Sequence, residues 1–166
     1  RRLVALMRDA FPGAIEYTVE AGRPDTITRE KLRAVREAGV RRISINPQTM
    51  NDRTLRVIGR GHTAQQIREA YALAREESIP HINMDLILGL PGETARDVRD
   101  TLEKVTALEP DDITLHALAI KRGSRLKLLM EERHVELPSD EETRKMSEVA
   151  LGFMKRGGYL PYYLYR

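Results

Sequence analysis

The sequence predicts an α/β fold in which a parallel sheet curves into a partial βα barrel. Short apolar runs alternate with stretches whose apolar residues recur every three or four positions, a pattern typical of strands joined by single helices. Right-handed crossovers of this kind produce a parallel sheet, either doubly wound or closed into a barrel. Four strand candidates are polar along one face, whereas a sheet covered by helices on both sides is apolar on both faces. One-sided polarity favours a barrel with a wet or ligand-filled lumen. The alternative is a sheet face open to solvent.

The predicted strands are residues 15–20, 42–46, 81–88, 113–119 and 159–165. Their side chains alternate between an apolar and a polar face, as expected for half-buried strands. In the third of them, Asn83 and Asp85 share one face and the opposite face is apolar. The last segment is the weakest candidate.

Helices fill the gaps between these strands. Capping-box patterns predict helix starts at Thr63, Thr94 and Ser139. A further helix is predicted to begin near Thr28 and to end at Gly39, and the last helix to end at residues 157–158.

Composition excludes several classes of protein. With 41% hydrophobic and 32% charged residues, the 166-residue chain can form a hydrophobic core under a well-solvated surface, as one domain or as part of a larger one. No apolar stretch approaches the ~20 residues that span a bilayer. The net charge of +3 is spread without a basic run, so neither a membrane nor a nucleic-acid partner is expected. Absence of cysteine excludes disulfides, zinc–thiolate sites and a cluster held by these residues.

In βα barrels the functional site lies at the carboxyl ends of the strands. Those ends carry Glu20, Asn46 with Gln48, Asp85 and residues 116–119. Asp85 is the strongest candidate, because a carboxylate in an otherwise apolar strand is costly unless it is paired or binds a ligand.

Each of these residues also has a structural interpretation. Asp85 could pair with a backbone amide or an arginine, Glu20 with Arg23, and Gln48 could be a turn residue after Pro47. The residue types and their spacing leave both interpretations open.

Two loops add candidates. Arg60 lies between Gly59 and Gly61 just before a helix start, where its guanidinium could bind a ligand carboxylate or remain a solvated charge. The turn at residues 89–94 suits any strand–helix connection and is weak evidence alone. The four histidines lack metal-ligand spacing, so no metal site is predicted from them. Nucleophile-elbow, Walker and dinucleotide motifs are absent from the sequence.

Three segments together resemble the radical SAM family of oxygen-independent coproporphyrinogen III oxidases. They are residues 42–51 (RISINPQTMN), 58–63 (IGRGHT) and 83–94 (NMDLILGLPGET), in this order and spacing. Residues 17–25 (YTVEAGRPD) and 158–166 (GYLPYYLYR) are most similar to the coproporphyrinogen dehydrogenase branch. The resemblance covers nearly the whole chain.

The resemblance implies a TIM-barrel-like partial barrel that holds a [4Fe-4S] cluster and S-adenosylmethionine (SAM). In this family, reductive cleavage of SAM yields a radical that removes hydrogen from propionate side chains of coproporphyrinogen III. The propionates lose carbon dioxide and become vinyl groups, giving protoporphyrinogen IX in anaerobic haem biosynthesis. The cluster cysteines and the early glycine-rich SAM segment of the family lie upstream of the matched region. We therefore expect residues 1–166 to be the later, truncated part of the barrel, inactive alone as an oxidoreductase.

The resemblance also assigns residue roles. The position of Glu20 contacts the cluster-bound SAM, and those of Gln48, Arg60, Asp85 and Ala119 line a second SAM site in related proteins. No residue of the chain is assigned to catalysis, and none to metal binding.

The expected partners follow from the same reading. They are a tetrapyrrole substrate and an unidentified electron donor, and the expected location is the cytoplasm. The 166-residue chain is expected to self-associate through an uncovered sheet edge or to have a poorly ordered edge there. The alternative function is a haem-binding chaperone of the same family without oxidase activity. A barrel enzyme for phosphorylated substrates lacks support, because the sequence has no glycine-rich phosphate loop.

Overall fold

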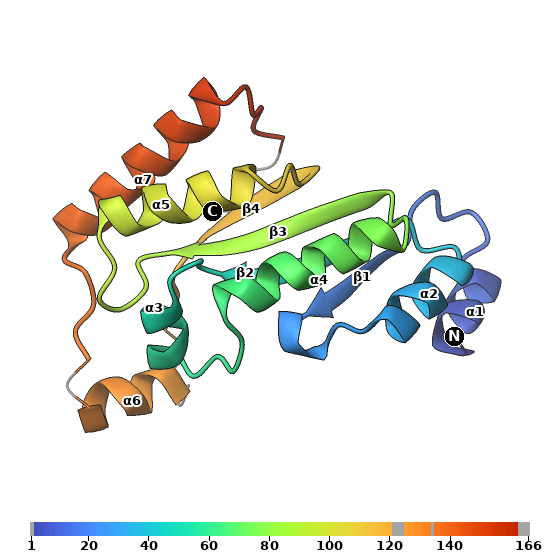
Figure 1. Ribbon diagram of the computed structural model, residues 1–166, viewed down its shortest axis with the longest axis horizontal. Coiled ribbons are helices and arrows are strands. Elements are labelled where there is room, and N and C mark those ends of the chain that lie inside the picture. The colour runs from blue at the N-terminus through green and yellow to red at the C-terminus, as the bar shows by residue number, and fades with distance from the viewer. Residues whose placement is uncertain (1, 121–124, 134, 163–166) are drawn as a thin grey trace.

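The computed structural model describes residues 2–120, 125–133 and 135–162. Its elements alternate between helices and strands along the chain (Figure 1). They are α1 (Arg2–Ala10), β1 (Thr18–Gly22), the 3-10 helix η1 (Pro24–Thr26), α2 (Arg29–Glu37), β2 (Arg42–Gln48), α3 (Asp52–Val57), α4 (Ala64–Glu76), β3 (His81–Leu88), α5 (Ala95–Thr106), β4 (Asp112–Ala117), α6 (Arg125–Arg133) and α7 (Asp140–Arg156).

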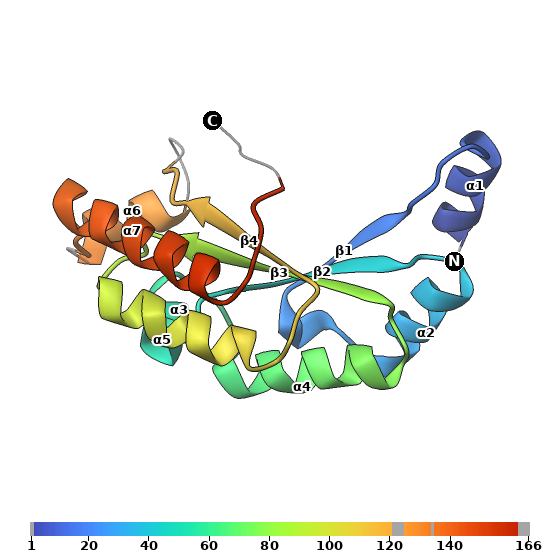
Figure 2. The same cartoon turned by 90° about the horizontal axis from the view of Figure 1, so that it is seen from above.

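The strands form one parallel four-stranded sheet in the order β1-β2-β3-β4. Helices α2, α4 and α5 lie along one face, and no helix of the described residues covers the middle of the opposite face (Figure 2). This arrangement confirms the predicted partial barrel and excludes a doubly wound sheet for the described residues.

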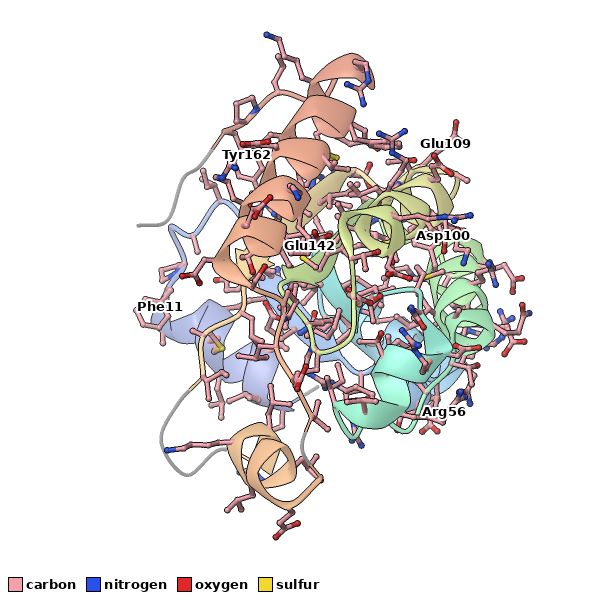
Figure 3. The ribbon with its side chains drawn as sticks, turned by 90° about the vertical axis from the view of Figure 1, so that its left-hand side faces the viewer. Phe11, Arg56, Asp100, Glu109, Glu142 and Tyr162 are labelled. Carbon is pink, nitrogen blue, oxygen red and sulfur yellow. The ribbon has the colours of Figure 1, made fainter. Side chains whose placement is uncertain are left out.

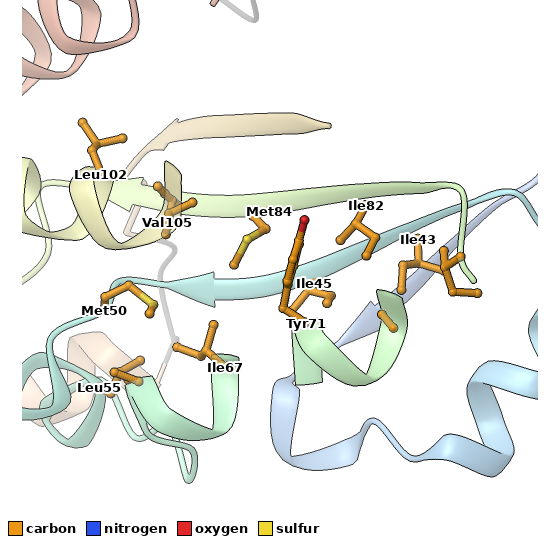
Figure 4. Packing of buried hydrophobic residues seen from close by; sticks show 14 of the residues in the cluster. Ile43, Ile45, Met50, Leu55, Ile67, Tyr71, Ile82, Met84, Leu102 and Val105 are labelled. Carbon is orange, nitrogen blue, oxygen red and sulfur yellow. The ribbon is translucent and has the colours of Figure 1, made fainter. Parts of the chain in front are cut away.

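The hydrophobic core lies between the sheet and these helices. Ile43 and Ile45 of β2 and Ile82 and Met84 of β3 are fully buried beneath α4 and α5 (Figure 4). Side chains at i and i+2 share a face of a strand, so the residues between them necessarily point to the other side of the sheet. The apolar face therefore fixes which residues line the concave surface.

The bounds of β1, β2 and β4 differ from the prediction. β1 spans Thr18–Gly22 instead of residues 15–20. It begins at Thr18 because its ladder starts where Thr18 pairs with Arg42, the first residue of β2, and Ile15 is fully exposed. β2 continues two residues beyond Asn46, and β4 spans Asp112–Ala117 instead of 113–119. β3 has the predicted bounds. Residues 159–162 form no strand, and 163–165 lie outside the described residues.

The predicted helix starts are confirmed. Thr63 and Thr94 form complete capping boxes with Gln66 and Asp97. Ser139 caps α7 by accepting from the backbone N–H of Glu142. The Glu142 carboxylate, however, accepts a hydrogen bond from the backbone N–H of Ala95 at 2.8 Å instead of closing a box, and so joins α7 to the start of α5 (Figure 3).

Candidate functional site

Polar side chains form a hydrogen-bonded chain across the concave face of β2, β3 and β4. The amide nitrogen of Asn83 donates to Asp85 Oδ1 at 2.6 Å and to Ser44 Oγ at 3.3 Å, and its oxygen accepts from Thr114 at 2.9 Å. Both donors and the acceptor of this buried amide are therefore satisfied, which fixes its orientation.

Asp85 lies half-buried near the end of β3. Its structural partner is Asn83, neither the arginine nor the backbone amide that the structural interpretation suggested. Its second oxygen, Oδ2, accepts no hydrogen bond from the residues that the structure describes. An exposed lone-pair site at the carboxyl end of a central strand can accept from a hydroxyl or ammonium group of a ligand.

Glu20 lies in β1, next to the end of β2. Asn46 Nδ2 donates to Glu20 Oε2 at 3.4 Å, while Arg23 pairs with Asp25 at 3.4 Å, so the predicted alternative of a Glu20–Arg23 pair is wrong. The amide oxygen of Asn46 is buried and accepts no hydrogen bond among the described residues. A buried acceptor without a partner is costly, so this edge of the sheet is incomplete as it stands.

Gln48 ends β2 in an unusual backbone conformation. It has a φ of 71°, and the register of β2 against β3 shifts between Ile45 and Gln48. The residue is buried and lines a small cavity of about 10 Å³ with Thr49 and Glu93. Such a cavity holds one water molecule at most. The bulge thus separates Gln48 from the polar row of Asn83, and no hydrogen bond among the described residues joins it to Glu20 or Asp85.

Arg60 lies half-buried in the loop between α3 and α4. It makes no ion pair with a described residue, and burial lowers the pKa of its guanidinium, an effect that Arg23 reinforces and Asp25 opposes. A half-buried cation without a close ion pair is unfavourable unless a ligand supplies an anion. Ala119 is exposed beyond the end of β4, and the described contacts do not connect it to the other candidates.

Sequence reasoning missed two buried polar residues beside these candidates. Glu93 is 4% exposed and His62 is 2% exposed. Glu93 follows the turn glycine Gly92 and precedes the cap Thr94, a context in which a charged residue is usually solvated. No local signal distinguishes either residue from a surface one, because their burial depends on loops from different strands meeting.

Two kinds of site are not found in the described part of the chain. It contains no cluster of three or more His, Cys, Asp or Glu side chains arranged to hold a metal ion. None of its helices combines the length and the apolar character that crossing a bilayer requires.

The fold and this edge of the sheet define a class, the parallel partial barrels that bind a ligand at the carboxyl ends of their strands. Residues 2–105 match the sequence pattern of the Radical SAM superfamily, and the chain belongs to that superfamily.

Comparison with individual proteins narrows the relationship. The chain is 45% identical over 151 residues to the oxygen-independent coproporphyrinogen-III oxidase-like protein HemZ of Bacillus subtilis, covering 91% of this chain and 30% of HemZ. It is 31% identical to the heme chaperone HemW of the same organism, over 89% of this chain and 38% of HemW. The chain therefore spans about a third of the length of these relatives.

The fold matches solved structures of the superfamily. Coproporphyrinogen III oxidase (HemN) from Escherichia coli superposes with a TM-score of 0.80 at 27% identity, over 96% of this chain and 37% of HemN. The archaeal Elp3 of Methanocaldococcus infernus matches with a TM-score of 0.72 at 17% identity, over 81% of this chain and 32% of Elp3, which shows the fold alone.

Membership of the superfamily implies SAM and a [4Fe-4S] cluster, and the residues fit these two groups differently. Several groups at this edge suit the ammonium, hydroxyl and carboxylate groups of SAM. They are the Asn46 oxygen and the Arg60 guanidinium, which have no partner among the described residues, the open lone pairs of Asp85 and the exposed Glu20 carboxylate. The cluster is held by cysteine thiolates, and this sequence has no cysteine. These 166 residues therefore do not fit the cluster.

Proposed function

We propose that the intact protein is a SAM-dependent radical enzyme that converts propionates of coproporphyrinogen III to vinyl groups. The present residues supply the part of the barrel that binds and orients SAM. The observation that carries this proposal is the set of polar groups at the carboxyl edge that lack partners among the described residues, above all the half-buried guanidinium of Arg60, which makes no ion pair with any of them. The 45% identity to the oxidase-like protein HemZ supports the choice of substrate class.

Each side chain has a separate task in this proposal. Glu20 accepts hydrogen bonds from hydroxyl or ammonium groups of SAM, held in place by Asn46. Asp85, held by Asn83, offers a second acceptor, and Arg60 binds a carboxylate of the ligand. SAM bound at a reduced cluster supplies the radical chemistry, while the protein supplies orientation and electrostatics.

The test uses the intact protein after anaerobic reconstitution. With SAM, a reductant and coproporphyrinogen III, we expect protoporphyrinogen IX and 5′-deoxyadenosine to accumulate together. Arg60→Ala should lower both, and Arg60→Lys, which keeps the charge but loses the bidentate geometry, should lower them less. Equal yields in all three proteins would overturn the role of Arg60, and no product from the wild type would overturn the proposal.

A haem chaperone is the second candidate, favoured by the 31% identity to HemW over nearly the same residues. The same preparation separates the two functions. Stoichiometric haem binding without decarboxylation of coproporphyrinogen III would favour the chaperone.

A further inference from the structure

His62 is a buried histidine outside the set of candidate ligands. Its side chain has no exposed surface, although it lies in the loop between α3 and α4. Nε2 lies 3.4 Å from the carbonyl oxygen of Pro47, and Nδ1 lies 3.7 Å from Oδ1 of Asp25. Because loop side chains are usually exposed, the complete burial of this imidazole calls for a physical explanation.

The contacts of His62 join three segments. Pro47 directly precedes Gln48 in β2, Asp25 lies in η1 just after β1, and Arg60 is two residues before His62 in its own loop. Glu20 lies in the strand before η1, Gln48 directly follows Pro47, and Arg60 lies in the same loop as His62. The imidazole is therefore the side chain through which the three candidate SAM-binding segments meet.

The acceptor at Pro47 fixes the protonation of the ring. A carbonyl can only accept, so Nε2 carries the proton, and in the neutral ring Nδ1 is then an acceptor. Nδ1 is buried and has no hydrogen-bond partner among the described residues; the Asp25 carboxylate lies 3.7 Å away, and the positive charges of Arg60 and Arg23 also act on the ring. Burial, the largest cause, lowers the pKa of His62, which keeps the ring neutral, while Pro47 and Asp25 oppose this effect.

We propose that His62 is a positioning residue, whose Nε2–H holds the Pro47 carbonyl and thereby sets the bulge at the end of β2, the strand end that borders the proposed SAM site. The bulge depends on this support because Gln48 has a φ of 71°, a left-handed conformation that is costly for a residue other than glycine. The inference rests on the proposed SAM site and adds a residue that does not itself touch the ligand.

Three substitutions distinguish the roles of the two ring nitrogens. The amide nitrogen of His62→Gln can occupy the position of Nε2 and donate to Pro47. The shorter side chain of His62→Asn places its donor near the position of Nδ1, toward Asp25, and leaves the Pro47 carbonyl unpaired. His62→Leu fills the space and removes both polar atoms.

In the intact protein we expect SAM affinity in His62→Gln to stay near that of the wild type. In His62→Asn and His62→Leu it should fall about tenfold, as expected for the loss of one buried hydrogen bond. Hydrogen exchange without SAM should be faster over residues 46–50 in the Asn and Leu variants only. Thermal unfolding of each variant serves as the control for a general loss of stability.

The outcomes distinguish this inference from the proposed function. If the wild type binds SAM and all three variants bind it equally, His62 does not position the site. The inference also fails if affinity follows the unfolding temperature instead of the ability to donate to Pro47. If the wild type binds no SAM, the proposed function fails, while the exchange experiment still tests whether His62 holds the bulge.

Discussion

The hydroxyl of Thr49 donates to the buried carboxyl of Glu93 at 2.6 Å, joining the segment after β2 to the loop after β3. Thr101 of α5 extends this contact, because its hydroxyl lies 3.1 Å from that of Thr49 and accepts from the backbone N–H of Met50. The two loops that follow Gln48 and Asp85 are therefore fixed against each other and against α5. These contacts hold the segment after Gln48 and the loop after β3 at a fixed distance from each other.

Glu93→Gln is expected to be at least as stable as the wild type near neutral pH. Burial raises the pKa of Glu93, and the hydrogen bond from Thr49 only partly opposes it. A folded-state pKa above the unfolded value means that stability is greatest below the unfolded pKa and is lost as the pH rises through the folded value. Glutamine keeps an acceptor for Thr49 and never ionises, so the variant should lose less stability over that window.

Chemical unfolding between mildly acidic and neutral pH measures this difference. Glu93→Leu is the control, because it removes the acceptor as well as the charge and leaves the hydroxyl of Thr49 without its partner. A Gln variant that is as unstable at neutral pH as the Leu variant would show that the ionised carboxylate itself stabilises the fold.

Glu77→Gln is expected to destabilise the protein near neutral pH. Arg33 Nε donates to Glu77 at 2.9 Å and, with Arg29, lowers the pKa of this carboxyl at the end of α4. A lowered folded-state pKa gives stability that is present above the ordinary pKa of glutamate and is lost as the pH falls through the folded value. The difference between wild type and variant should therefore shrink on acidification.

Thermal unfolding from neutral to acidic pH tests this expectation. Glu76→Gln is a matched control, because Glu76 is adjacent and also pairs with Arg29 but is exposed, where an ion pair contributes little. Equal effects of the two substitutions at every pH would contradict the expectation that the buried Glu77 stabilises the fold more than the exposed Glu76.

Asp85→Ala is expected to weaken SAM binding by the intact protein about tenfold while leaving the fold near native. Asp85→Asn keeps an acceptor for Asn83 and loses only the charge, so it separates the structural contact from the ligand contact. Calorimetric titration with SAM gives the affinities. Wild-type affinity in both variants would remove Asp85 from the site.

The 166-residue chain is expected to self-associate at micromolar concentration. β1 has a strand neighbour on one side only among the described residues, and an unpaired edge can pair with another chain. Close by, α1 and the residue after it expose Leu3, Leu6 and Phe11, the last at the margin of the molecule in Figure 3.

Light scattering with Leu3→Lys and Leu6→Lys tests this expectation, since both charges should reduce association. Leu151→Lys on α7 is the control, because Leu151 is similarly exposed on a helix that is remote in sequence. A monomer over the whole micromolar range, with slow hydrogen exchange along Thr18–Gly22, would contradict the expected self-association.

Much of the fold follows from local signals in the sequence. The alternation in β3 and the caps at Thr63 and Thr94 depend on neighbouring residues alone, and the structure has them where they are predicted. The start of β1 could not be predicted, since it is set by where β2 begins. Local patterns are reliable where the determining contacts are local.

The residues of the candidate site also fall into those that local signals predict and those that they do not. Strand ends and alternation select Glu20 and Asp85 without any tertiary knowledge. The bulge that buries Gln48, the meeting of Thr49 with Glu93 and the burial of His62 depend on residues 15 to 44 positions apart. Such contacts carry no periodic signal, so a sequence pattern cannot indicate them.

The most direct test of the central claim is the SAM affinity of intact Glu20→Gln. The account predicts about tenfold weaker binding than in the wild type, since a neutral amide replaces the carboxylate that faces the ligand's hydroxyl or ammonium groups. Glu16→Gln, an exposed carboxylate just before the other end of β1 that accepts from Thr18, should bind SAM as the wild type does. Equal affinity in all three proteins would contradict the assignment of SAM to the carboxyl edge of this sheet.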